Sequence, residues 1–441
     1  MSRDIPLEKR YEFSKSQREQ LDLEDDTQGE SRVNSVCGLY WLDPRYSNQL
    51  IEKAANLILE HEQALRLRFA QRDGEFFQYE QEFEYVSIPA IETTWSRDEI
   101  IASARNEVMA KSFVPEAPLY DLLIVRNASA VALRSLFFHL VMDGISMGLW
   151  GDLLTSYCRM LFEGERFDCE AHSFTDSFEK EKHMLESPRR QADWRYWAEK
   201  MRDWTGCCKI NPQKVATGNP RGKRLSMPLD KAFLQQIYAH CEERTFSPAI
   251  LFRAALVLYL LCKNPGMRRI DLGETISHRK DSGQKQTMGN FALEILVCIV
   301  VPDQDADVES LYKAIRKAGR ESYYHSMCSY EDVLRMVQSQ RPEVEALRDV
   351  QFGYIPPVSW HRKAFDGTWI ANESPETSLE FIILSPFSKE DVVIMFDYRD
   401  DTFSAEEAGT ALHSILELVK ACIANPSMSI RDACQLVEAR G

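Results

Sequence analysis

The feature that most constrains the fold is an apolar segment that predicts a strand, a turn and a helix in direct succession. Residues 119–126 and 131–140 are rich in apolar and β-branched residues, and turn-like residues 127–129 separate them, so two neighbouring strands are expected. After Gly144, Ser146 is a suitable N-cap for a helix with an apolar face that ends near Gly164. A strand that passes directly into a helix indicates an α/β fold.

One histidine stands at this passage from strand to helix. His139 follows the apolar residues of the second strand, and Asp143 and Gly144 follow it before the helix begins. A neutral imidazole can remove a proton from an attacking amine or hydroxyl near pH 7, or orient that group by a hydrogen bond. Asp143 can fix the turn by pairing with a cation, and a glycine lets the backbone turn sharply and come close to a ligand. His139, Asp143 and Gly144 are therefore the candidate catalytic residues.

The same spacing also has an ordinary structural explanation. In a chain with nine histidines, a His-x-x-x-Asp spacing arises by chance in roughly one case in two. His139 would then be a partly buried residue at a strand end, and Asp143 would cap a helix. The evidence for a site therefore depends on the segments that surround this spacing.

The length of 441 residues favours two lobes, because single hydrophobic cores stop growing at about 250–300 residues. Residues 206–223 combine glycines and prolines with little apolar periodicity, which predicts a linker between an N-terminal lobe, residues 1–205, and a C-terminal lobe, residues 224–441. Helical and strand patterns alternate in both lobes, so each should hold a mixed sheet with helices. Helices are expected at residues 47–69, 97–111, 247–263, 308–322 and 405–424, and strands at 37–42, 75–79, 269–277, 295–301, 379–384 and 392–396.

Composition and charge argue against several classes of function. The chain has 53 basic and 68 acidic side chains and a net charge of -15, which disfavours nucleic acid or an anionic membrane as the main partner. The first residues are polar and the apolar runs are too short or interrupted to span a bilayer, so a cytoplasmic protein is expected. The eleven cysteines form no Cys-x-x-Cys pair, so we expect neither a metal site nor a disulfide framework.

Several segments, in their order along the chain, resemble the condensation domains of nonribosomal peptide synthetases. The segment around His139 is similar to the family's His-His-x-x-x-Asp-Gly motif, with His139 at the position of the second histidine. Residues 64–69 are similar to the end of its Arg-His-Glu-x-Leu-Arg-Thr-x-Phe motif, and residues 276–279 resemble the strand end that carries its arginine. Further similarities are to the opening motif at residues 13–17, the Gly-x-Phe motif at 288–291, the His-Gln-Asp-x-Pro-Phe-Glu motif at 325–334 and the Asp-Leu-Ser-Leu motif at 376–381. Each segment alone is a weak signal, but their shared order is specific.

The resemblance implies two chloramphenicol-acetyltransferase-like lobes arranged as a V, with a substrate tunnel between them. An acyl or peptidyl thioester on the phosphopantetheine arm of a carrier protein would enter from one side, and an amine would enter from the other. The carrier proteins would act in trans, and the chain itself would need no intrinsic cofactor. His139 would act as a base or orienting group, and Asp143 would form a salt bridge with Arg279 across the lobes. The implied tunnel lining includes Phe138, Ser146, His278 and Gly289.

One departure from the family pattern keeps other functions open, since Phe138 stands at the first histidine of the motif. An acyltransferase of the same superfamily would take acyl-CoA or a polyketide thioester and make an ester or amide on a free small molecule. The Asp-Phe-Gly-Trp-Gly motif of its plant-type members is absent. A non-catalytic domain that recruits carrier or tailoring proteins is the third alternative. An epimerisation domain would need an additional acidic partner that the sequence does not reveal.

Overall fold

The computed structural model describes residues 5–6, 9–26, 35–72, 75–110, 113–214, 221–355, 366–371, 373, 376–385 and 392–438. The described residues of Met1–Leu185, Ser277–Leu293 and Val358–Ser374 form one compact unit. Those of Glu186–Ile276, Glu294–Pro357 and Pro375–Gly441 form a second unit. This division differs from the predicted boundary at residues 206–223, because two later segments belong to the first unit and residues 186–205 belong to the second.

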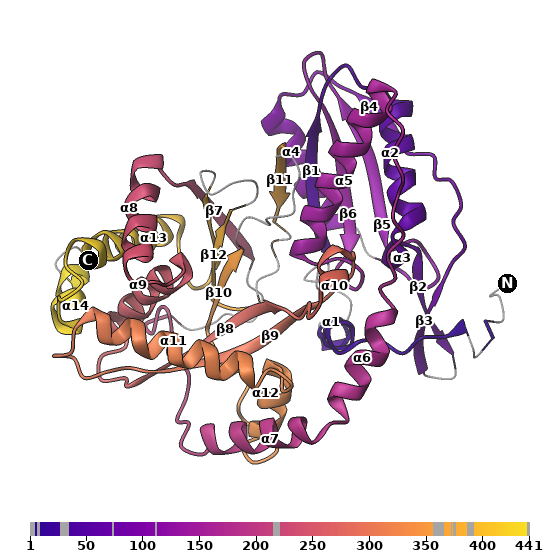
Figure 1. Ribbon diagram of the computed structural model, residues 1–441. Coiled ribbons are helices and arrows are strands. Elements are labelled where there is room, and N and C mark those ends of the chain that lie inside the picture. Colours follow the sequence, from indigo (N-terminus) through magenta and orange to yellow (C-terminus); the bar gives the residue numbers. More distant parts are fainter. Residues whose placement is uncertain are drawn as a thin grey trace. The chain divides into compact units, whose positions relative to one another are not determined.

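The first unit is built on a five-stranded mixed sheet in the order β11-β1-β6-β5-β4 (Figure 1). β4 runs parallel to β5, and the other neighbouring strands are antiparallel. β11 pairs with β1 in a register from Cys37↔Ile370 to Trp41↔Asp366, and this pairing draws a late segment of the chain into the first unit. The strands are β1 (Ser35–Leu42), β4 (Ala90–Glu92), β5 (Tyr120–Arg126), β6 (Val131–Phe138) and β11 (Asp366–Ile370).

Helices cover both faces of this sheet. Side chains of β1 alternate between two apolar clusters: Tyr40 packs with α2 and α5 on one face, and Leu39 packs with α4 on the other. All eight residues of β1 are consequently buried. The helices of this unit are α1 (Lys15–Asp26), α2 (Asn48–His61), α3 (Gln63–Arg66), α4 (Arg97–Ala110), α5 (Gly144–Glu163), α6 (Asp176–Leu185) and α10 (Ser282–Gln286).

The predicted single helix over residues 47–69 is wrong in its second half. Glu62 has an extended backbone (φ -97°, ψ 103°), which ends α2, and α3 follows as one short turn. The chain then enters β2 (Leu67–Arg72), which pairs with β3 (Glu75–Glu80) as a two-stranded sheet. The apolar spacing did not reveal this break, because a short run of apolar residues fits a helical turn and the buried start of a strand equally well.

The second unit contains a six-stranded mixed sheet in the order β7-β13-β12-β10-β8-β9. β10 runs parallel to both β8 and β12, whereas β13 is antiparallel to β12 and β7. The sequence patterns did not indicate β10 or the short β11 of the first unit. The strands are β7 (Gly222–Pro228), β8 (Arg269–Ser277), β9 (Ala292–Val300), β10 (Val350–Ile355), β12 (Leu379–Leu384) and β13 (Val393–Arg399).

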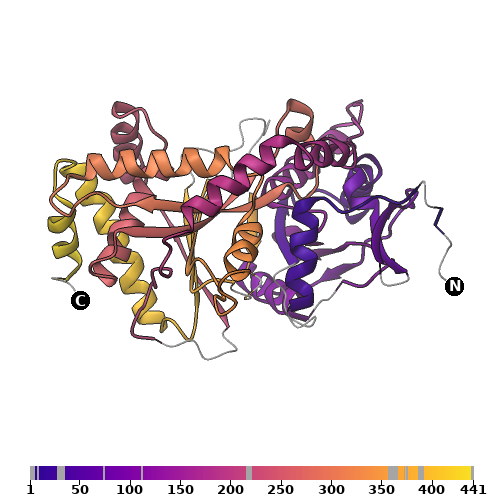
Figure 2. The same cartoon turned by 90° about the horizontal axis from the view of Figure 1, so that it is seen from below.

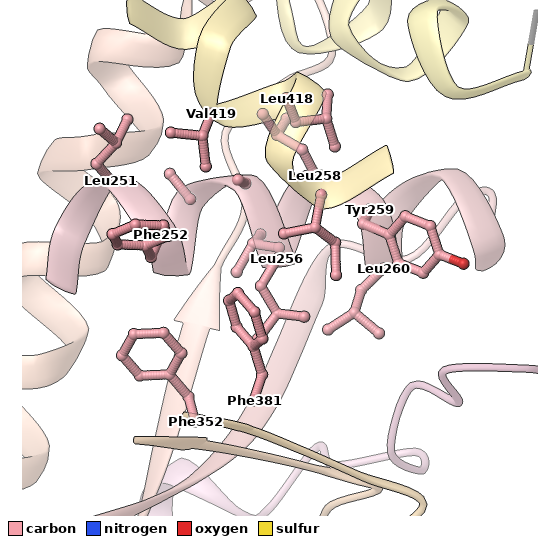
Figure 3. Close-up of a cluster of buried hydrophobic side chains, with 14 of the residues drawn as sticks. Leu251, Phe252, Leu256, Leu258, Tyr259, Leu260, Phe352, Phe381, Leu418 and Val419 are labelled. Atoms are coloured by element: carbon pink, nitrogen blue, oxygen red, sulfur yellow. The ribbon is translucent and has the colours of Figure 1, made fainter. Parts of the chain in front are cut away.

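Five helices build the core of the second unit on one face of its sheet. The central helix α9 is buried from Leu251 to Leu261, and Figure 3 shows Phe252 facing Phe352 and Phe381 of the sheet. The C-terminal helices α13 and α14, in yellow, lie side by side in Figures 1 and 2. These five are α8 (Lys231–Glu243), α9 (Pro248–Lys263), α11 (Val308–Tyr324), α13 (Ala405–Ala424) and α14 (Ile430–Glu438).

Two further helices, α7 (Pro188–Lys200) and α12 (Tyr330–Gln338), pack together with β9 in a separate cluster of the second unit. Within the described ranges, no single helix is long and apolar enough to cross a membrane. α8 and α9 meet that requirement only as a pair, across a bend of 102°.

Candidate active site

β6 leads directly to His139 at the start of the turn before α5. The N–H of Phe138 donates to the carbonyl of Leu119 at 2.9 Å, and the N–H of Val141 donates to the carbonyl of Phe138 at 3.1 Å. His139 is half-buried, and its Nδ1 is buried without a partner group among the residues described. Burial lowers the pKa of His139 and outweighs the opposing charge of Asp143. The imidazole is therefore neutral near pH 7.

Asp143 is the N-cap of α5, a role that the sequence pattern had assigned to Ser146. Its Oδ1 accepts a hydrogen bond from the N–H of Ser146 at 2.8 Å, and its Oδ2 accepts one from the N–H of Phe291 at 3.0 Å. Burial alone would raise the pKa of Asp143, but the charge and hydrogen bonds of Arg279, with these two N–H groups, lower it. Asp143 is thus an ionised buried carboxylate with its acceptors satisfied.

Arg279 binds Asp143 through two nitrogen atoms. Nη1 donates to Oδ2 at 2.5 Å and Nη2 donates to Oδ1 at 3.1 Å, in the two-pronged geometry that suits guanidinium and carboxylate groups. The remaining donors reach the Ser146 hydroxyl at 2.8 Å and the carbonyl of Gln284 at 3.1 Å. The pairing that the resemblance implied is therefore present. It lies within the first compact unit and not across two lobes, because residues 277–293 belong to that unit.

Ser146 and Gly289 join the turn to the segment that follows α10. The Ser146 hydroxyl donates to the carbonyl of Gly289 at 2.8 Å and accepts from its N–H at 3.0 Å. Gly289 has a φ of 154°, and a Cβ at this position would collide with the ring of Phe174, so the close approach requires glycine. Both residues are parts of the support around Asp143, and Ser146 is fully buried.

The structure also gives the surroundings of three other predicted site residues. Phe138 is 1% exposed and stacks against Phe113 at 5.2 Å between ring centroids, so its side chain packs in the core, and its place in a tunnel lining stays a prediction. Gly144 is the first residue of α5 and has no positive φ, so the turn does not depend on a glycine conformation there. His278 is buried, and its N–H donates to the carbonyl of Phe291 at 2.8 Å.

Glu62 supports the same region but was not singled out from the sequence. One of its oxygens pairs with Nδ1 of His172 at 2.7 Å, and the other accepts from the N–H of Met288 at 3.2 Å. The hydrogen bond to Glu62 raises the pKa of His172. The sequence predicted Glu62 as one residue of a helix, and nothing in that pattern indicates a contact with His172 or Met288. Its position just before the motif-like residues 64–69 was the one available indication.

These residues suit proton transfer. Within the part of the chain that the structure describes, no group of three or more His, Cys, Asp or Glu side chains could hold a metal ion. A neutral, half-buried imidazole can accept a proton from a nucleophile that reaches its exposed part. The first N–H groups of α5, at Gly144 and Ile145, lie at the positive end of a 20-residue helix, where a developing negative charge is stabilised.

Comparison with known proteins places the chain in a family. The sequence profile described as Condensation domain matches residues 8–440. Surfactin synthase subunit 1 from Bacillus subtilis (strain 168) is 23% identical over 403 residues, which covers 88% of this chain and 11% of the relative. Bacitracin synthase 1 from Bacillus licheniformis is 26% identical over 200 residues, which covers 44% of this chain and 4% of the relative. The chain thus spans only a small part of the length of these synthetases.

Solved structures share the fold at low sequence identity. The first condensation domain of the CDA synthetase has a TM-score of 0.83 at 15% identity, with 96% of this chain and 98% of that chain covered. A variant of the starter condensation domain of rhizomide synthetase RzmA, in complex with a CoA derivative, has a TM-score of 0.82 at 17% identity, with 96% and 97% covered. The predicted fold class, two chloramphenicol-acetyltransferase-like units with mixed sheets and helices, is confirmed, whereas the V and its tunnel stay predictions. The chain belongs to the condensation-domain family.

Proposed function

We propose that this chain transfers an acyl or peptidyl group from a carrier-protein thioester to an amine, forming an amide bond, with His139 as base or orienting group. The observation that carries this proposal is the state of His139. It is half-buried, burial lowers its pKa, and its Nδ1 has no hydrogen-bond partner among the residues described. It lies four residues from a carboxylate that Arg279 binds with two hydrogen bonds.

The proposed reaction needs one base and no covalent intermediate on the protein. The acceptor nitrogen attacks the thioester carbonyl carbon, a C–N bond forms, and the nitrogen releases a proton to His139. The C–S bond then breaks, and the departing phosphopantetheine sulfur takes the proton, so an amide and a thiol are the products. Asp143 and Arg279 would hold the turn while the charge on the imidazole changes.

The family supports this reaction class, because the chain matches the condensation-domain profile and its matched relatives include a protein named as a nonribosomal peptide synthetase. Carrier proteins and their phosphopantetheine arms are accordingly the proposed donors, and a small amine or a carrier-bound amine is the proposed acceptor.

A second candidate is an acyltransferase that takes its donor from acyl-CoA and acylates a free hydroxyl or amine. The observation in its favour is that a structural neighbour, the RzmA starter domain, is in complex with a CoA derivative. A donor assay that compares carrier-bound and CoA-bound thioesters separates the two candidates.

The structure offers little support for a non-catalytic domain. That alternative rested on Phe138 at the first histidine of the motif. The Phe138 side chain is buried between Phe69 and Phe113, so this substitution changes core packing, and the second histidine position of the motif, His139, is retained.

The test is product formation with defined substrates. The protein is incubated with acyl-loaded carrier proteins, or with acyl-CoA, and a panel of amine and alcohol acceptors, and products are identified by mass spectrometry. His139→Ala is compared with His183→Ala, which changes an exposed histidine in α6. We expect an amide that depends on His139 and not on His183. Formation of an ester from acyl-CoA would favour the second candidate, and absence of any product with every donor would contradict both.

A further inference from the structure

A pair of buried glutamines links α1 to β3 beside the turn that carries His139. Gln17 lies in the first turn of α1 and Gln78 lies in β3, and they are 0% and 1% exposed. Nε2 of Gln17 donates to Oε1 of Gln78 at 3.0 Å, and Nε2 of Gln78 donates to Oε1 of Gln17 at 2.8 Å. The two amides therefore form a reciprocal pair, and each restricts the orientation of the other.

The second donor of Gln17 is directed at the turn. Nε2 of Gln17 also donates to the backbone carbonyl of Leu140 at 3.0 Å, and Leu140 directly follows His139. Oε1 of Gln17 accepts a further hydrogen bond from the N–H of Ser14 at 3.0 Å. These partners fix the direction of the amide, because a reversed amide would place its oxygen against the Leu140 carbonyl and its NH₂ against the Ser14 N–H.

His139 depends on its backbone for its position. Its imidazole Nδ1 has no hydrogen-bond partner in the described part of the chain, so no hydrogen bond at that atom fixes the ring. Before it, Phe138 is held by β-pairing, and after it, Asp143 is held by Arg279. Between these two anchors, the Leu140 carbonyl receives the Gln17 amide.

We propose that Gln17, supported by Gln78, is a positioning residue for His139. This inference rests on the proposed function, in which His139 meets the attacking nitrogen. Loss of the amide would leave the buried Leu140 carbonyl without its partner, and the turn would shift to satisfy it. A shift of about 1 Å in a catalytic group can lower a rate about 100-fold, so the effect should appear in kcat more than in substrate binding.

The variant Gln17→Met tests this role, because methionine is similar in length but cannot make these hydrogen bonds. Gln63→Met is the matched control, since Gln63 is also a buried glutamine of the first unit and its amide bonds to Thr175 and Glu80, away from the turn. We expect Gln17→Met to lower kcat about 10- to 100-fold with KM changed less than about threefold. Gln63→Met should lower the melting temperature but leave kcat near the wild-type value.

A double-mutant cycle with His139→Ala separates positioning from general damage. If Gln17 acts through His139, Gln17→Met should change the residual rate of the His139→Ala protein less than about twofold. A full additional loss in that background, an unchanged kcat in the single variant, or an equal loss in Gln63→Met would each overturn the proposal. If Gln17→Met does not fold, Gln78→Met is measured instead and should show the same pattern with a smaller loss.

A measurement that does not depend on transfer activity, the NMR titration of His139, separates this proposal from the proposed function. The NMR titration of His139, assigned by its absence in His139→Ala, should move in Gln17→Met and stay unchanged in Gln63→Met. A wild-type transfer rate in His139→Ala would contradict the proposed function, even if the pKa of His139 changed in Gln17→Met. An unchanged pKa of His139 in Gln17→Met would contradict the positioning role of Gln17, even if His139 proved essential for transfer.

Discussion

Each compact unit contains a buried arginine that binds carboxylates, and the two differ in their balance of charge. In the first unit, Arg279 meets one carboxylate, Asp143, at 2.5 Å. In the second unit, Arg348 contacts both Glu294 and Glu376. The first arrangement is a matched pair, whereas the second has more acids than cations.

The pKa directions follow from this balance. The pKa of Asp143 is lowered, because Arg279 and two backbone N–H groups outweigh the effect of burial. Glu380 lies in β12, opposite Asp397 of β13. Its pKa is raised to about 8, first by burial and then by the charges of Asp397 and Glu376. Asp143, near His139, therefore stays ionised near pH 7, whereas Glu380 in the sheet of the second unit holds a proton below about pH 8. His139 must gain and lose a proton in the proposed reaction, so it benefits from a neighbouring carboxylate, Asp143, that keeps its charge while it does so.

The largest expected effect breaks the matched pair. Arg279→Ala should lower the free energy of unfolding by about 3–5 kcal/mol, because Asp143 would remain as a buried charge without its partner. Denaturant unfolding of Asp143→Ala, Arg279→Ala and the double variant measures this. The double variant should cost little more than either single change. Simple additivity of the two losses would contradict the view that the residues act as a unit.

The next effect concerns the unmatched acids. The pKa of Glu380 is raised from 4.5 to about 8, so the folded protein holds a proton that the unfolded chain releases. Stability from this group is fully present below pH 4.5 and is lost as the pH rises to about 8, with a slope of up to about 1.4 kcal/mol per pH unit. Glu380→Gln should flatten the stability profile between pH 5 and about 8.

Asp143→Asn is the contrasting control for that profile. A lowered pKa means that Asp143 loses its contribution only as the pH falls below its ordinary value of 3.8, so this variant should not change the slope above pH 5. An unchanged slope in Glu380→Gln would show that Glu380 does not hold the proton in the folded protein.

The smallest effect is a shift in the pH dependence of transfer. Because burial lowers the pKa of His139, the neutral base should persist below the ordinary value of 6.5. The rate, normalised to the unprotonated acceptor, should fall with decreasing pH at a midpoint below 6.5. A midpoint above 7 would mean that the charge of Asp143 outweighs burial at this site.

The sequence predicted the part of the site that is local along the chain. The apolar run into His139 and the start of α5 are local signals, and the order of family motifs indicated Arg279 as the partner of Asp143. The helix cap was assigned to Ser146 because serine and aspartate are both good caps, and the structure shows Asp143 in that position.

Contacts between distant segments were not predictable in the same way. β11 pairs with β1 across more than 300 residues, and neither strand carries a mark of its partner, so the predicted lobe boundary missed this exchange. Gln17 and Glu62 act through single hydrogen bonds to backbone groups of other segments. The sequence around Gln17 and Glu62 does not show which distant backbone group each side chain contacts, so only the folded structure reveals these contacts.

The most direct test of the central claim is a single-turnover measurement of amide formation by the wild-type protein and by His139→Ala. Both proteins would receive the same acyl-loaded carrier and amine, and thermal unfolding would verify that the variant is folded. We expect the His139→Ala rate to fall by about 100-fold or more at an unchanged melting temperature, as for loss of a general base. A folded His139→Ala protein that forms the amide at nearly the wild-type rate would contradict the account.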